Sequence, residues 1–287
     1  MTPEDRAAWR PILEGMAAAV AAAVRGVAGT ERGRAPLDIG AGGDRTRVVD
    51  QVAEDAVVAA CVALHARGAT FLLRSEELGD RRFGADLPIL LVDPVDGSRN
   101  AMSGLPYFST SLALLDGPTL GSTAVGVVRS LAAPGEFSAV RGGGAWQDGR
   151  PLRPLAVALG QGGHIPLLAL EAHRSFGHGV AHAGPDLAEL LRAAGRVRLL
   201  GSSALTLCHA AAGAVSGLVA PDGMRAHDCA AGLLILRESG AVATALDGSS
   251  LDEVPAAVGV ASPLVASASA EVHRRLLELL GASSERP

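Results

Sequence analysis

The sequence predicts a mixed α/β fold built in layers. Two observations support this prediction: helical periodicities and short β-rich runs are mixed in the first half, and short strands alternate with helices in the second half. The chain has 287 residues, of which 48% are hydrophobic. It can therefore bury a sizeable core, as one large domain or two modest ones.

The first half is predicted to begin with two helices. Residues 3–28 are Ala-rich and amphipathic, and residues 47–66 carry apolar side chains at helical spacing, after a glycine-rich loop at Gly40–Gly43. Short apolar runs then predict strands over 70–73, 89–92, 109–115, 123–128 and 137–146, the last with a glycine-rich bend.

The second half alternates strands and helices. The predicted strands are 197–200 and 217–220, and the predicted helices are 186–194, 203–212, 228–239 and 269–280. The composition changes near Arg153–Gly163, which predicts an N-terminal subdomain over 1–155 and a C-terminal one over 156–287.

Composition excludes several classes of protein. The formal charge is −5 and all 25 basic residues are arginine, so no lysine exists for a Schiff base or a phosphate-binding P-loop. This excludes pyridoxal-phosphate enzymes and Walker-type nucleoside triphosphatases. The chain has only two Trp, one Tyr and five Phe, so it offers no platform for stacking bases, and we expect no nucleic-acid partner.

The expected compartment is the cytoplasm, with no membrane contact. The three cysteines are widely spaced, which indicates reduced thiols rather than a disulfide framework. The apolar stretch Ala17–Val24 follows Glu4, Asp5 and Glu14, whereas a signal peptide begins with basic residues. No other apolar run approaches the roughly 20 residues that a membrane span needs.

Acidic residues follow the apolar runs of the first half. Glu76 follows the run at 70–73, Asp93 and Asp96 follow the run at 89–92, and Asp228 begins a predicted helix. Ionised carboxylates gathered at strand ends need cations to neutralise them, and an oxygen-only donor set favours Mg²⁺ over zinc. Gly97 and Ser98, which directly follow Asp96, offer backbone N–H groups to an anion. Carboxylates that can bind metal ions lie next to backbone amides that can bind a phosphate. This combination indicates an enzyme of phosphoryl transfer.

Four sequence blocks carry a family resemblance. Thr46–Asp50 (TRVVD), Ser75–Gly79 (SEELG), Asp93–Ser98 (DPVDGS) and Asp228–Gly232 (DCAAG) occur in an order and spacing that resemble the inositol monophosphatase family. The closest likeness is to its archaeal-type branch, which is associated with fructose-1,6-bisphosphatase and inositol-1-phosphatase activity. The resemblance implies a five-layer α/β/α/β/α sandwich and a homodimer.

The same resemblance implies roles for individual residues. Two to three Mg²⁺ ions would be held by the carboxylates of Glu76, Asp93, Asp96 and Asp228 and by the backbone carbonyl of Val95. A third, looser ion would lie near Glu76 and Asp50. Ser98 and Asp50 would orient a metal-bound water that attacks the phosphorus directly and in line. Glu77 would lie just outside the ligands.

Substrate recognition departs from the family pattern. Pro221 stands where inositol-specific members have an acidic residue, with Asp222 next to it, and Arg99 is also unusual. The resemblance places these residues at the substrate: Gly97, Ser98, Arg198, Ser203 and Arg225. Arginine suits phosphate through its planar fork of donors.

The sequence therefore predicts a magnesium-dependent phosphomonoesterase that acts on a small sugar or cyclitol phosphate, fructose 1,6-bisphosphate or inositol 1-phosphate. Three alternatives stay open: a phosphatase for a 3′-phosphoadenosine nucleotide, a phosphatase for histidinol phosphate, or a non-catalytic regulatory protein on the same fold. A zinc site of Glu171 with His173, His178 and His182 is not favoured, because their spacing fits no known zinc motif.

Overall fold

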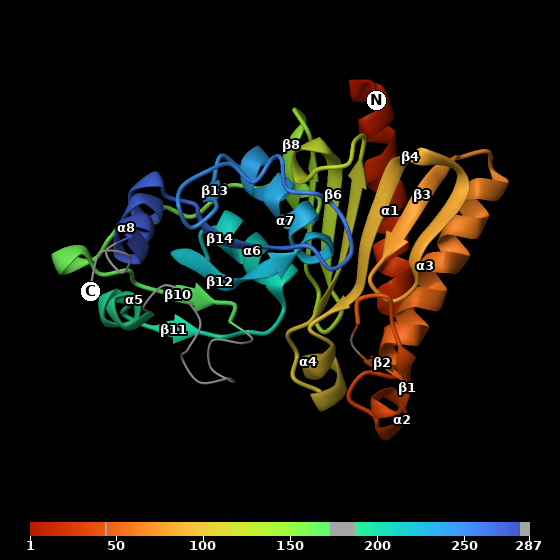
Figure 1. Ribbon diagram of the computed structural model, residues 1–287, viewed down its shortest axis with the longest axis horizontal. Helices are drawn as coiled ribbons and strands as arrows, with labels where there is room; N and C mark the ends of the chain where they lie inside the picture. Colours follow the sequence, from red (N-terminus) through yellow and green to blue (C-terminus); the bar gives the residue numbers. More distant parts are fainter. Residues whose placement is uncertain (44, 173–186, 282–287) are drawn as a thin grey trace.

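Helices and sheets alternate in five layers in the computed structural model, which describes residues 1–43, 45–172 and 187–281 (Figure 1). The layered α/β prediction is confirmed. Two sheets lie side by side with helices between them, and further helices cover their outer faces.

The first layer consists of α1 (Pro3–Val24) and α3 (Val48–Ala66). The Thr2 side chain accepts a hydrogen bond from the Asp5 N–H, and Asp5 returns one to the Thr2 N–H, so a capping box starts α1. One face of α1 packs on the first sheet through its buried apolar residues, Leu13, Met16, Ala17, Val20 and Val24. The predicted end at residue 28 is four residues too late, because turns follow Val24.

The second layer is a seven-stranded sheet. Its strands, in spatial order, are β3 (Phe71–Ser75), β4 (Gly79–Asp96), β5 (Ser109–Leu115), β6 (Thr123–Ser130), β7 (Glu136–Val140), β8 (Gly144–Gln147) and β9 (Arg150–Pro151). Strand β4 passes β3 twice, since Ser75 pairs with both Gly79 and Val92. The sequence found only the second passage, because the first is mostly exposed and lacks an apolar pattern.

The middle layer consists of α6 (Ser203–Ala211) and α7 (Ala226–Glu238), which lie between the two sheets (Figure 1). Both helices are buried on almost all sides, as expected of helices that are apolar all round. They approach their neighbours very closely. A Cβ added at Gly126 of β6 would lie 2.9 Å from the Ala231 Cα of α7, and one added at Gly232 would lie 2.8 Å from the Leu207 Cβ of α6.

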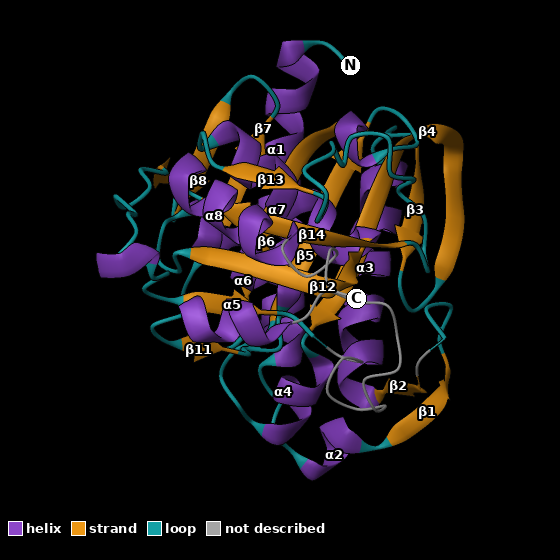
Figure 2. Cartoon of the chain, turned by 60° about the vertical axis from the view of Figure 1, so that its left-hand side comes forward, coloured by secondary structure: helices purple, strands orange, loops and turns teal. Residues whose placement is uncertain are grey.

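The last two layers are a five-stranded sheet and its outer helices. The strands, in spatial order, are β11 (Val197–Arg198), β10 (Leu168–Leu170), β12 (Gly217–Arg225), β14 (Ala261–Ser267) and β13 (Val242–Thr244). Helices α5 (Leu187–Ala193) and α8 (Ala270–Gly281) cover its outer face (Figure 2). The predicted start of α5 at Asp186 lies outside the described residues.

The remaining elements are short. They are α2 (Glu31–Arg34), β1 (Pro36–Ile39), β2 (Arg45–Arg47), α4 (Ser98–Ser103) and the 3₁₀ turns η1 (Leu120–Ser122) and η2 (Gln161–Gly163). Sequence analysis did not predict them, nor β9, β10, β13 and β14, because a strand of two to four residues, or one rich in Ala, Ser and Pro, shows no clear period.

The strands of the first sheet end at residue 151 and those of the second begin at 168. The subdomain boundary at 155/156 falls between them and stays a prediction.

One helix of the described part of the chain, α1, is long and apolar enough to cross a membrane by length and composition. Core helices and signal sequences meet the same criterion, and in this fold α1 packs one face against the first sheet.

Because β6 and α7 approach so closely at Gly126, any side chain added there should lower the stability of the protein. We expect Gly126→Ala to lower the free energy of unfolding by about 1–3 kcal/mol, because its Cβ would press on the Ala231 backbone. Urea denaturation of the two proteins measures the difference. The matched control is Gly15→Ala on the exposed face of helix α1, where no atom lies within 4 Å of the added Cβ and alanine should stabilise the helix. Equal unfolding midpoints for Gly126→Ala and the parent would contradict this packing.

Candidate active site

Two carboxylates lie at the end of β4, where the strand meets the middle helices. Asp93 and Asp96 are almost fully buried, with 2% and 6% of their surfaces exposed. The Val95 N–H donates to Asp93 Oδ1 over 2.9 Å, so the bend that follows the strand is held by the first of these acids. Thr110 of β5 donates its hydroxyl to the Asp93 carbonyl, which fixes the end of β4 against the next strand.

Asp96 is fixed by the start of α6. Its oxygens accept hydrogen bonds from the Ser202 hydroxyl at 2.5 Å, the Ala204 N–H at 2.8 Å and the Ser203 N–H at 3.1 Å. A helix N-terminus stabilises negative charge, so α6 supports this carboxylate. Even so, burial, followed by repulsion from Asp228, raises the pKa of Asp96 to about 8.

Asp228 completes one group of ligand atoms. It lies in the first turn of α7, and one oxygen each from Asp93, Asp96 and Asp228 lie within 4.8 Å of one another. Burial, and then repulsion from Glu76 and Asp228, raises the pKa of Asp93 well above its usual range. Three crowded carboxylates with an all-oxygen donor set fit a hard divalent cation such as Mg²⁺.

Glu76 lies in the turn after β3 and belongs to a second group. An oxygen of Glu76, one of Asp93 and a ring nitrogen of His227 lie within 4.8 Å of one another. Arg225 Nη1 is 2.6 Å from Glu76 Oε1, and His227 Nε2 is 3.5 Å from the same atom. Burial raises the pKa of Glu76, but His227 and Arg225 outweigh it, so the pKa falls below its usual value.

Asp50 and Ser98 lie beside this cluster. Asp50 Oδ2 accepts a hydrogen bond of 2.8 Å from the Arg47 N–H at the start of α3. Asp50 Oδ1 is buried and has no hydrogen-bond partner among the described residues. Burial is the main reason that the pKa of Asp50 is raised, and the Ser98 hydroxyl is one of the groups that oppose the rise. Ser98 donates its hydroxyl to the Val95 carbonyl over 2.9 Å.

Gly97 joins the acidic bend to α4. Its φ is +91°, a left-handed conformation that favours glycine, and an added Cβ would lie 2.7 Å from the Gly201 carbonyl oxygen. The loop before α6 therefore packs directly on this bend. Asn100 reinforces the contact by donating to the Leu200 carbonyl over 2.7 Å.

The remaining predicted residues differ in what they contact. Glu77 accepts a hydrogen bond from the Thr46 hydroxyl, and burial raises its pKa to about 7. Arg198 is exposed on β11 and donates to the Val197 carbonyl. Ser203 contacts Asp96, and Arg225 contacts Glu76, so both touch predicted ligands. Arg99 is exposed on α4.

The model of the inositol monophosphatase family matches residues 5–285. The chain belongs to the inositol monophosphatase family.

Individual relatives agree with this assignment. A fructose-1,6-bisphosphatase/inositol-1-monophosphatase of Methanothermobacter thermautotrophicus is 30% identical over 291 residues, which cover 98% of this chain and 99% of the relative. An inositol-1-monophosphatase of Mesorhizobium japonicum is 35% identical over 210 residues, 72% of this chain and 74% of the relative. A solved structure from Pyrococcus horikoshii, described as having similarities to inositol-1 monophosphatase, has the same fold, with a TM-score of 0.77 at 24% identity over 97% of this chain and 99% of that one.

Membership of the inositol monophosphatase family makes the protein a hydrolase of phosphoric monoesters that acts on small phosphorylated substrates. The resemblance stated from the sequence is confirmed, as is the enzyme class. The acidic cluster at the carboxyl end of β4 offers this member of the inositol monophosphatase family the ligand atoms for a metal ion.

Two residues at the site were missed by sequence analysis. His227 was missed because side chains of neighbouring residues on a helix point about 100° apart. A predicted metal ligand at Asp228 therefore does not predict that residue 227 also faces the site. Glu171, considered above only for zinc, is buried after β10 and accepts a hydrogen bond of 2.9 Å from the Thr206 hydroxyl of α6. Burial raises the pKa of Glu171 to about 7. The three histidines considered with it lie outside the described residues.

The crowding of carboxylates predicts opposite effects of one substitution with and without metal. Asp93→Asn keeps the oxygen that accepts the Val95 N–H and removes one charge. We expect its melting temperature in EDTA to exceed that of the parent, because repulsion falls. In Mg²⁺ the order should reverse, since the parent gains about 2.7 kcal/mol at 100 times its dissociation constant.

Differential scanning calorimetry measures both effects. The matched control is Asp86→Asn, whose carboxylate is 69% exposed and pairs with Arg82 far from the cluster. It should change neither melting temperature. A Mg²⁺-dependent rise of equal size in Asp93→Asn and the parent would show that Asp93 holds no ion.

Proposed function

We propose that this inositol monophosphatase family member hydrolyses a small sugar or cyclitol phosphate, fructose 1,6-bisphosphate or inositol 1-phosphate, with two to three Mg²⁺ ions bound at Glu76, Asp93, Asp96 and Asp228. One observation carries the proposal. Carboxylates from three separate segments, the turn after β3, the end of β4 and the first turn of α7, converge within ligand distance of one another. Asp93 belongs to both groups, so it is suited to bridge two ions.

The bound ions supply Lewis acidity, which neutralises phosphate charge and lowers the pKa of water. The chain then has to orient that water and accept its proton. Asp50 Oδ1 is the available acceptor, since it is buried and no hydrogen bond from any described residue reaches it. Burial raises the pKa of Asp50, which makes its carboxylate a stronger proton acceptor. Ser98, which lies between Asp50 and the Val95 carbonyl, is suited to fix the direction of attack.

Substrate binding is proposed for the residues that the family resemblance places at the substrate. The backbone of Gly97 and Ser98 follows Asp96 directly, in a left-handed turn that begins α4. Arg198 is exposed, so its guanidinium is accessible to a second phosphate. The N–H of Ser203 is occupied by Asp96, and Arg225 is paired with Glu76, so we propose that these two act on the substrate through the metal ligands.

The experiment that tests the activity is phosphate release by the purified protein with Mg²⁺ or EDTA. Four substrates are compared: fructose 1,6-bisphosphate, inositol 1-phosphate, 3′-phosphoadenosine 5′-phosphate and histidinol phosphate. We expect Mg²⁺-dependent turnover of one of the first two. Preference for either of the last two would replace the proposed substrate class, and turnover of none would favour a non-catalytic protein.

Asp50 gives a prediction that separates chemistry from metal binding. We expect Asp50→Asn to lower kcat by about 10²–10⁴-fold, because the amide cannot take up a proton, while the Arg47 N–H contact persists. Steady-state phosphate release gives kcat, and titration calorimetry gives the Mg²⁺ affinity. Asp55→Asn, five residues further along α3 and exposed, is the control and should leave kcat unchanged. A kcat for Asp50→Asn within threefold of the parent would remove Asp50 from the chemistry.

We further propose that the protein acts as a homodimer in the cytoplasm, as the family resemblance implied. Light scattering of the purified protein should give twice the chain mass of 28.9 kDa. A particle of one chain mass would contradict the dimer. Localisation is tested by fractionating cells and following the protein with an antibody.

A further inference from the structure

His227 is a buried polar side chain at the active site that the proposed reaction does not use. It occupies the second position of α7, directly before Asp228, and its side chain is 0% exposed. Neither ring nitrogen makes a hydrogen bond of ordinary geometry with any described residue. A buried polar atom left without a hydrogen bond costs about 1–3 kcal/mol, and Nε2 has only carboxylate oxygens of Asp228 and Glu76 at ion-pair distance.

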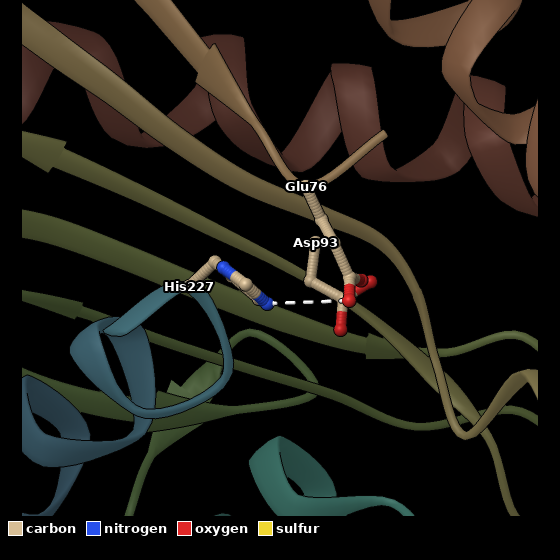
Figure 3. A group of neighbouring side chains, drawn as sticks. All are labelled: Glu76, Asp93 and His227. Carbon is tan, nitrogen blue, oxygen red and sulfur yellow. Dashed lines mark ion pairs between the residues drawn. The ribbon is translucent and has the colours of Figure 1, made fainter. Parts of the chain in front are cut away.

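The ring points at the carboxylates. Its Nε2 is 3.3 Å from Asp228 Oδ1 and 3.5 Å from Glu76 Oε1. Figure 3 shows the edge of the imidazole facing the carboxylate ends of Glu76 and Asp93, with the dashed line joining Nε2 to Glu76. A ligand atom of each of these three side chains lies within 4.8 Å of the other two, a separation that one cation can bridge.

The position of His227 is fixed by its backbone. Ser111 of β5 donates its hydroxyl to the His227 carbonyl over 2.9 Å, where the first sheet meets α7. Because the same helix turn carries Asp228, both side chains are placed by one rigid element. A nitrogen and an oxygen donor held in this way have less conformational freedom to lose when a metal binds.

The donor sets of the two groups therefore differ in chemistry. Asp93, Asp96 and Asp228 offer oxygen only, which suits Mg²⁺, whereas Glu76, Asp93 and His227 offer two oxygens and an imidazole nitrogen. Imidazole suits first-row transition metals better than Mg²⁺, and their affinity rises along the series from Mn²⁺ to Cu²⁺ and falls again at Zn²⁺. We propose that His227 Nε2 is a metal ligand, and that the Glu76–Asp93–His227 position takes a transition-metal dication in preference to Mg²⁺.

This inference rests on the proposed function in one respect, that cations bind at this cluster. It replaces Mg²⁺ by a transition-metal dication at the Glu76–Asp93–His227 position, so that the loaded enzyme holds mixed metals. Arg225 is already paired with Glu76 Oε1, so a cation at this position competes with the guanidinium for that oxygen.

The test is spectroscopic and uses the full chain. The metal-free protein is loaded with one equivalent of Mn²⁺ in excess Mg²⁺, and electron spin-echo envelope modulation is recorded. A coordinated imidazole places a ¹⁴N nucleus next to the Mn²⁺, so we expect nitrogen modulation in the parent protein. If the Mn²⁺-loaded parent protein shows no nitrogen modulation, the proposal is overturned. This outcome needs no variant, so it does not depend on whether a variant folds.

Two variants assign the nitrogen. We expect His227→Gln and His227→Phe to lose the modulation and to bind Mn²⁺ at least tenfold more weakly, with Mg²⁺ affinity changed less than threefold. The control His65→Gln, on the exposed side of α3, should retain both. Modulation that persists in both His227 variants would assign the nitrogen elsewhere and overturn the proposal.

Phosphate release in Mg²⁺ alone separates this inference from the proposed function. Turnover with no nitrogen signal would leave a phosphatase in which His227 serves only as an ion-pair partner of Glu76. A nitrogen signal without turnover of any phosphate ester would leave the metal site in place and remove the proposed activity.

Discussion

Repulsion among buried carboxylates is the constraint on which the site depends. Asp93, Asp96, Asp228 and Glu76 converge where little water reaches them, and burial opposes the charged form of each. The protein moderates this repulsion locally, for instance by directing the N-terminus of α6 at Asp96. Cations supply the remaining neutralisation, so metal binding and the stability of this region are physically linked.

The layered fold brings these acids together. β4 carries two of them, the turn after β3 carries one, and α7 carries the last, on a helix that lies between the two sheets. The glycines at 97, 126 and 232 allow the close approaches that dock these layers, because each would place a Cβ under 3 Å from a neighbouring atom. The geometry of the metal ligands thus depends on close packing of the elements that carry them. The functional site is supported on rigid elements rather than on long loops.

Glu76 is distinguished from the other acids by its basic neighbours. Arg225 and His227 lower its pKa, whereas the pKa values of Asp93, Asp96 and Asp228 are raised. Both basic residues come from the segment that joins β12 to α7, so one connection supplies a metal acid and the groups that modify another acid. Positive groups are therefore concentrated on the Glu76 side of the cluster.

The sequence alone determined the family, the layered class and the acids, because ordered blocks such as DPVDGS are local and the apolar periods of long helices and buried strands are strong. The strand 109–115 and the helix from residue 203 were predicted at their observed starts for the same reason. Tertiary structure alone decided the first passage of β4, the pairing of Arg225 with Glu76 and the place of His227. Each depends on contacts between segments that are distant in the chain. An exposed strand lacks an apolar period, and a residue that adjoins a metal ligand on a helix has no sequence pattern of its own. Sequence spacing records direction along one element, whereas a metal site is defined by where several elements meet.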